Sequence, residues 1–149
     1  MDLASFILAV VSFVVSIISI ITSFNQNQKI NSLNLQSRYF EKIFDKYLIE
    51  EIPKARAYIR YHHNKLADVN KLVDTLDELK KSSLYFKYSN KEFYQKLKES
   101  IDDLGQFLTD CSNNSEPDLD QQSQNMLEIG NKIASIYKLI NTYSTGTNE

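Results

Sequence analysis

Residues 3–24 read LASFILAVVSFVVSIISIITSF, a stretch of 22 residues without a charged side chain. A helix rises about 1.5 Å per residue, so a stretch of this length matches the roughly 30 Å hydrocarbon core of a bilayer. The first two residues, Met1 and Asp2, lack the positive charge with which a secretory signal peptide starts. We therefore expect residues 1–24 to form an uncleaved transmembrane anchor.

The charged residues beside this stretch predict its orientation. No lysine or arginine precedes it, whereas Lys29, Arg38, Lys42 and Lys46 follow it. Lysine and arginine flank the cytoplasmic end of a membrane span. We expect a single-pass protein of the cell inner membrane whose C-terminal part is cytoplasmic. The single cysteine, Cys111, fits a reducing compartment and excludes a disulfide scaffold.

Small residues inside the apolar stretch recur with alternating spacings of four and three. They are Ser5, Ala9, Ser12, Ser16, Ser19 and Ser23. Small side chains let helices approach closely in lipid, and serine hydroxyls can hydrogen-bond across such a contact. We expect self-association through this seam, either as a tight bundle or as a pore, because both arrangements share the pattern. Serines that bond back to their own helix while facing lipid are the alternative interpretation.

An amide-rich stretch, residues 25–37, follows the anchor without a helix breaker. Seven of its residues are asparagine or glutamine. Gln26, Ile30 and Leu33 continue the spacing of the seam. We expect a helical neck in which uncharged amides face one another around the axis of an oligomer. A polar juxtamembrane linker is the alternative.

The rest of the chain has the composition of a helical protein. Over all 149 residues, 42% are hydrophobic and 24% are charged, and three glycines and two prolines argue against a β-sandwich or a loop-rich protein. From residue 38 onward apolar residues recur every three or four positions, without strand alternation. We predict an all-α fold in which a cytoplasmic four- or five-helix bundle, residues 38–143, follows the transmembrane helix and ends in a loose tail, residues 144–149.

Local signals predict where the helices of this bundle begin and end. Pro53 fits the start of a helix or a kink. Asp68 can cap a third helix, and Ser89 with Glu92 has the spacing of a capping box. Residues 113–117 are rich in helix breakers and predict the loop before the last helix.

Charge is segregated along the sequence. The net charge is +4 over residues 25–65, +2 over residues 66–98 and −7 over residues 99–149. Positive charge close to a membrane suits anionic headgroups or a phosphate-bearing ligand. The acidic last third argues against broad nucleic-acid binding, and solvated faces of like charge remain the alternative explanation.

Both histidines of the chain lie in one basic cluster, RAYIRYHH, at residues 56–63. On a helix, Arg56, Arg60 and His63 would share one face and could hold a phosphate-bearing ligand. His62 falls on the apolar stripe beside Ile59, where we expect a partly buried packing residue or a further ligand contact. A solvated face with ion pairs is the alternative interpretation of the two arginines.

This cluster resembles the motif of HEPN domains, small helical bundles that include many ribonucleases, in which four to six residues separate an arginine from a histidine. Five residues separate Arg56 from His62, and six separate it from His63. With its N-terminal span, the chain is similar in layout to small membrane accessory proteins of type VI CRISPR systems. That resemblance implies a homo-oligomeric membrane pore that strengthens anti-phage defence. Membrane effectors of type III CRISPR systems, which bind cyclic oligoadenylate, are a second similar class.

Two smaller groups of residues complete the candidates. The acidic pairs at residues 102–103 and 118–120 are interpreted as solvated or helix-capping residues rather than as metal ligands. Tyr85, Phe86 and Tyr88 are a candidate exposed aromatic patch for a partner.

From these patterns we expect a homo-oligomeric membrane effector that forms a pore or depolarises the membrane in prokaryotic anti-phage defence, rather than an enzyme. A membrane-tethered HEPN-like ribonuclease or cyclic-oligonucleotide sensor is one alternative, and a scaffold that recruits a cytoplasmic partner is another. Expected partners are the bilayer, further copies of the chain, and a nucleotide second messenger, RNA or a CRISPR effector complex. We expect no cofactor, catalytic residue or metal, because one cysteine and two adjacent histidines cannot form a structural zinc site. Glycine-rich nucleotide loops are also absent from the sequence.

Overall fold

The structure, a computed structural model, describes residues 3–113 and 117–145, with side chains for residues 15–113 and 117–144. Nearly all of this part is helical, so the predicted all-α class is confirmed. The chain divides into two compact units, Met1–Arg38 and Tyr39–Glu149.

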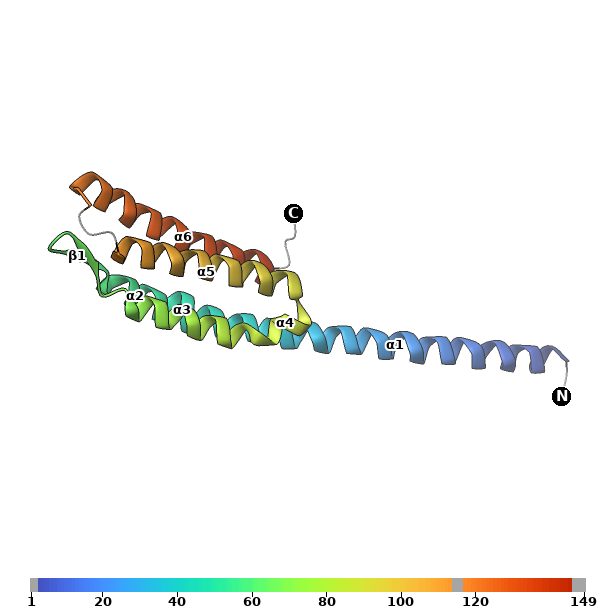
Figure 1. The fold of residues 1–149 in the computed structure, drawn as a ribbon. Coiled ribbons are helices and arrows are strands. Elements are labelled where there is room, and N and C mark those ends of the chain that lie inside the picture. Colours follow the sequence, from blue (N-terminus) through green and yellow to red (C-terminus); the bar gives the residue numbers. More distant parts are fainter. Residues whose placement is uncertain (1–2, 114–116, 146–149) are drawn as a thin grey trace. The chain divides into compact units, whose positions relative to one another are not determined.

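The first unit is made by one helix, α1 (Leu3–Ile43), which runs without interruption through the apolar stretch and the amide-rich stretch (Figure 1). Every side chain from residue 15 to residue 35 is exposed. Across the part of the chain that the structure describes, none of the helices combines the length and the apolar character needed to cross a membrane. The seam residues Ser5, Ala9 and Ser12 lie outside the described side chains.

The second unit begins in the last residues of α1. The helical path continues through a π-helix, η1 (Phe44–Glu51), into α2 (Ile52–Tyr58). Pro53 lies in the first turn of α2, where its missing N–H fits the start of a helix. The predicted helix start at Pro53 is therefore confirmed, although the chain reaches it along a helix rather than from a loop.

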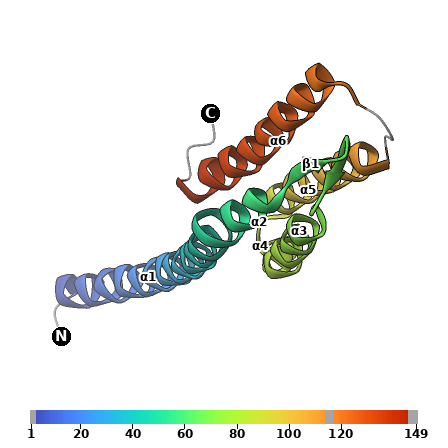
Figure 2. The same ribbon diagram turned by 90° about the vertical axis from the view of Figure 1, so that its left-hand side faces the viewer.

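A short β-hairpin, β1 (Arg60–His62) paired antiparallel with β2 (Lys65–Ala67), separates α2 from the remaining helices. These helices are α3 (Asn70–Ser82), η2 (Ser83–Tyr85), α4 (Phe86–Ser89), α5 (Lys91–Asn113) and α6 (Leu119–Thr145). α5 packs between α3 and α6, and α2, which continues η1 along the chain, packs against α3 (Figures 1 and 2). The sequence showed no strand alternation, so the hairpin is an addition to the predicted fold.

One cluster of buried apolar side chains forms the core of the second unit. Its largest fully buried members are Tyr47, Phe86, Phe93, Ile43, Leu48, Ile52, Leu72, Leu76, Leu79, Leu97, Leu104 and Leu108. The rings of Phe40 and Phe86 lie 4.4 Å apart between centroids, and each lies 4.9 Å from the ring of Phe93. The apolar stripes of the sequence thus predicted the buried face of the helices correctly.

Two predicted helix caps are wrong. Asp68 adopts a φ of 61°, and its carboxylate pairs with Arg60 instead of capping α3. Asn90, rather than Ser89, caps α5, because its Oδ1 accepts a hydrogen bond of 3.2 Å from the backbone N–H of Phe93. The cap of α5 lies one residue later than predicted, at Asn90, and Asp68 lies in the connection before α3. Both helices nevertheless begin close to the predicted places.

Two of the three residues of the candidate aromatic patch are not exposed. Phe86 is fully buried, and Tyr85 is half-buried and stacks on Tyr39 with ring centroids 4.1 Å apart. Tyr88 alone of the three is exposed, at 86%. The tight turn of η2 before α4 points Phe86 inward, which removes the patch as a partner surface.

The acidic pairs lie at helix surfaces and at a helix start. Asp118 caps α6, since its Oδ1 accepts a hydrogen bond of 2.7 Å from the backbone N–H of Gln121. Asp103 pairs with Lys132 at 2.5 Å. The capping interpretation is confirmed for Asp118.

Two other predicted features, the loop at 113–117 and the tail at 144–149, fall in part outside the described residues, and α6 continues to Thr145.

Asp102 links α3 to α5, and its carboxylate accepts hydrogen bonds from Lys80 at 2.6 Å and Lys98 at 2.8 Å. These bonds hold the pKa of Asp102 below its usual range. The stabilisation is therefore present above the pKa of the unfolded state and is lost as the pH falls through the lower folded-state pKa. We expect Asp102→Asn to lower the free energy of unfolding by about 0.5–1 kcal/mol at pH 7, because the ion pairs are partly exposed.

Urea unfolding of both proteins at pH 7, and at a pH below both pKa values, measures this effect. The difference between wild type and Asp102→Asn should disappear at the lower pH. Asp110→Asn is the matched control in the same helix, because the Asp110 carboxylate accepts its hydrogen bond from the neutral amide of Gln106. Equal losses for the two variants at both pH values would contradict a role for the Asp102 ion pairs.

Candidate functional site

The basic cluster lies on a hairpin instead of on a helix face. α2 ends at Tyr58, and the chain then becomes extended. Arg60 and His62 lie in β1, whereas His63 lies in the turn with a φ of 49°. The prediction that Arg56, Arg60 and His63 share one helix face is therefore wrong, because the helix ends before Arg60.

The register of the hairpin decides which of its side chains face the core. Neighbouring side chains along a strand point to opposite faces. Tyr61 pairs with Leu66, and both pack against the core. Arg60, His62 and Lys65 lie on the outer face, where all three are exposed. The interpretation of His62 as a packing residue is wrong for the same reason, because Tyr61 takes the inward position.

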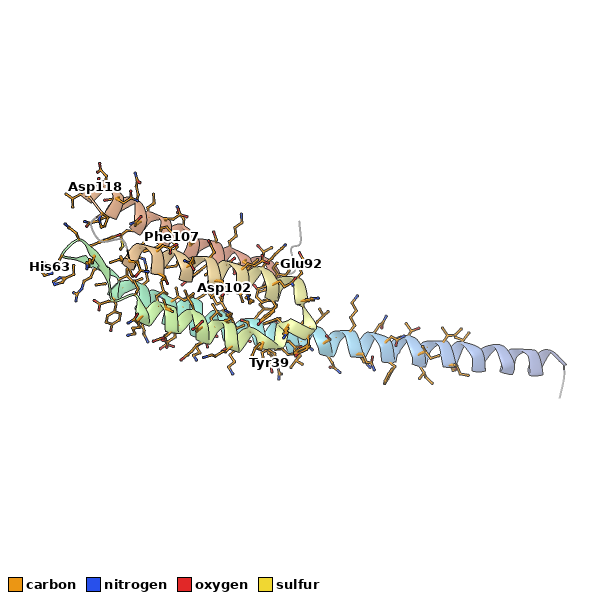
Figure 3. All side chains as sticks on the ribbon, in the orientation of Figure 1. Tyr39, His63, Glu92, Asp102, Phe107 and Asp118 are labelled. Carbon is orange, nitrogen blue, oxygen red and sulfur yellow. The ribbon has the colours of Figure 1, made fainter. Side chains whose placement is uncertain are left out.

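The two histidine rings lie together at the tip of this hairpin, with centroids 4.0 Å apart and planes 79° apart. Both are exposed, and Figure 3 shows His63 at the end of the second unit. Arg60 pairs through Nε with Asp68 Oδ2 at 3.3 Å, an exposed contact of the kind that contributes little stability. Among the described residues, no three histidine, cysteine or acidic side chains gather as they would around a metal ion.

Two sets of polar contacts hold the hairpin to the first turns of α6. The buried Asn125 donates from Nδ2 to the Tyr61 hydroxyl at 2.8 Å and accepts a hydrogen bond from Gln121 at 3.2 Å. Gln122 donates from Nε2 to Oδ1 of Asn64, in the turn, at 3.2 Å. The strand and the turn are therefore fixed to the same helix. Sequence reasoning missed these anchors, because Tyr61 and Asn125 are 64 residues apart.

Asn125→Leu is expected to lower the free energy of unfolding by about 1–3 kcal/mol, because the Tyr61 hydroxyl loses its partner in a partly buried place. Amide hydrogen exchange should also become faster in β1 and β2, because the hairpin is no longer fixed to α6. Asn131→Leu is the matched control, since Asn131 is exposed on the same helix. If exchange in the hairpin were equally fast in both variants, Asn125 would not be its anchor.

The outer face of the hairpin is the candidate ligand site. It combines a guanidinium, an ammonium and an imidazole, which are hydrogen-bond donors suited to an anion such as a phosphate. Arg56 does not belong to it, because this residue is half-buried in α2. Lys65, which sequence reasoning did not single out, does belong, because the register places it opposite His62.

The seam and neck residues lie on the first unit. Their described members are exposed on α1: Ser16, Ser19, Ser23, Gln26, Ile30 and Leu33. Thr22 donates a hydrogen bond of 2.8 Å to the carbonyl of Ile18, which is the back-bonding considered as the alternative for the serines.

Comparisons of the chain with protein-family models, with curated proteins and with solved structures found no match.

Proposed function

We propose that the chain is a single-pass protein of the inner membrane that acts as a homo-oligomeric membrane effector. The observation that carries this proposal is the uncovered apolar surface of α1. Six large apolar side chains on one helix are 42–68% exposed: Val15, Ile17, Ile18, Ile20, Ile21 and Phe24. An apolar surface of this extent is unfavourable in water and needs a cover, which the acyl chains of a bilayer provide.

The sequence around these residues supports the same proposal. The uncharged stretch extends back to residue 3, and Lys29 is the first charged residue after it. α1 is helical throughout this stretch, as a membrane span has to be. The lysines and arginines that follow it favour a cytoplasmic bundle.

Self-association is proposed to occur through the serine seam. Ser16, Ser19 and Ser23 follow one another at helical spacing and are exposed on α1, where a second helix can approach closely. A closed ring of such helices would place hydroxyl groups around a water path and thereby depolarise the membrane. The role in anti-phage defence rests on the resemblance to CRISPR-associated membrane proteins.

Depolarisation of bacteria that express the full-length chain, followed with a potential-sensitive dye, tests this function. The triple variant Ser16→Leu, Ser19→Leu, Ser23→Leu should stay in the membrane fraction and lose the depolarisation. Ile18→Leu with Ile21→Leu, on another face of the same helix, is the control and should behave as wild type. A chain that inserts as a monomer and leaves the potential unchanged would overturn the effector proposal in favour of a scaffold.

The hairpin favours a second function, recognition of a phosphate-bearing ligand. The observation behind it is the register that brings Arg60, His62 and Lys65 to one exposed face. Cyclic oligoadenylate is the probe, because a nucleotide second messenger offers several phosphates to these donors. We propose that Arg60→Ala with Lys65→Ala weakens binding about tenfold or more. Lys87→Ala, exposed on α4, is the control, and unchanged binding in the double variant would overturn this function.

A further inference from the structure

The outward face of α6 carries an uncharged stripe that the core of the second unit does not use. Its members are spaced four, four, three and four residues apart: Leu119, Ser123, Leu127, Gly130 and Ala134. All five are exposed, and Leu119 and Leu127 are exposed to 78% and 67%. Another face of the helix holds the buried residues Ile129, Ile136 and Ile140, and α6 packs against α5 (Figure 1). α6 is therefore apolar on two sides, of which its own unit covers one.

Gly130 lies in the middle of this stripe, and no other described part of the chain packs against it. Apart from the two chain neighbours and the helix's own backbone within four residues, a Cβ atom added at this position would meet no described atom within 4 Å. Glycine in a helix interior is destabilising relative to alanine, because it loses more conformational freedom on folding. A helix from outside the chain would make use of it, since a missing side chain lets a second backbone come close.

We propose that α6 is an interface between the bundles of two copies of this chain, packed antiparallel about a two-fold axis level with residue 129. In such an interface the same surface serves both partners, and each contact occurs twice. Leu127 of each copy then lies over the small residues Gly130 and Ala134 of the other. Ser123 of each copy lies beside Ala134 of the other, so that small side chains also meet on either side of the Leu127 contacts.

The charges beside the stripe agree with this register. Asp120 and Lys138 are exposed on the same flank of α6, and they lie at equal distances before and after residue 129. In the antiparallel pair, Asp120 of one copy comes level with Lys138 of the other, at both ends of the interface. In a parallel pair the same flank of the two helices lies on opposite sides of the contact, so Asp120 of one copy would not meet Lys138 of the other. The charge pattern therefore selects the antiparallel arrangement and a second copy as the occupant.

This interface is separate from the serine seam, because it joins the bundles through α6 and uses no residue of α1. It does not depend on a pore or on a change of membrane potential. Its test can therefore fail or succeed independently of the proposed function.

Disulfide cross-linking of the full-length chain in detergent tests the interface, in a Cys111→Ala background that removes the native thiol. Protein with Ser123→Cys is mixed with differently tagged protein with Ala134→Cys. In the proposed register these two positions lie within about 1.5 Å of the same level along the helix, whereas two copies of position 123 lie about 18 Å apart. We expect the mixed dimer to exceed either homodimer at least about tenfold, which is the preference that this difference in reach predicts.

Leu127→Asp, added to both proteins, should abolish the mixed dimer, because it places a charge over the small residues of the other copy. Leu84→Asp is the matched control, since it replaces an exposed leucine outside α6, and it should leave the cross-link unchanged. A dominant homodimer of the Ser123→Cys protein would indicate parallel packing and overturn the proposal. Absence of the mixed dimer would overturn it as well.

Discussion

The proposed membrane anchor predicts that Val15→Arg combined with Ile18→Arg moves the full-length chain from the membrane fraction to the soluble fraction. An arginine near the middle of a membrane helix costs about 2.5–3.5 kcal/mol on the insertion scale. Two of them therefore shift the partition by on the order of ten-thousandfold. Both native side chains are exposed on α1, so the substitutions remove no contact from the core of the second unit. Cell fractionation and flotation with lipid vesicles measure the shift.

Ile30→Arg combined with Leu33→Arg provides the matched control for this release. These residues are also exposed on α1 and also apolar, but they lie in the amide-rich stretch after the uncharged residues. The control is expected to stay in the membrane fraction, because its arginines lie at the polar interface. Retention of the Val15 and Ile18 variant would show that this stretch is not the anchor. Release of both variants would point to a general gain in solubility instead.

The buried face of the bundle could be predicted from the sequence, whereas the hairpin within it could not. Ile59 lies on a helical stripe of the sequence, and both it and Leu66, seven residues later, are buried. Ile59 reaches the core from the end of α2, and Leu66 reaches it from β2. The hairpin left no sign in the sequence, because strands of three residues are too short to show a period of two. The turn has no glycine, and His63 and Asn64 adopt positive φ values in its place. Asparagine tolerates this conformation, so Asn64 was the only local signal.

The candidate site shows the same limit. The clustering of Arg60 and His62 was visible in the sequence, but the face that they share depends on strand register. Lys65 joins them only across the turn, and the anchor Asn125 comes from a distant helix.

The uncharged stripe of α6 was missed for another reason. A search for one apolar face per helix finds Ile129 and its neighbours and treats the other faces as solvated.

Phe86→Ala is expected to lower the free energy of unfolding by about 3–5 kcal/mol, because it opens a cavity in the aromatic centre of the core. The Phe86 side chain is fully buried in contact with the rings of Phe40 and Phe93, which belong to α1 and α5. The surrounding backbone is helical and cannot collapse freely into the space. Urea unfolding, followed by tyrosine fluorescence and far-ultraviolet circular dichroism, measures the change.

Tyr88→Ala separates the effect of burial from the loss of an aromatic side chain two residues away. Tyr88 is exposed, so its removal should change the free energy of unfolding by less than about 0.5 kcal/mol. Phe86→Leu should cost less than Phe86→Ala, because leucine refills most of the cavity. If Tyr88→Ala were as destabilising as Phe86→Ala, burial at η2 and α4 would not be what stabilises this region. If Phe86→Ala left stability unchanged, the aromatic residues at 85–88 would again be candidates for a partner surface.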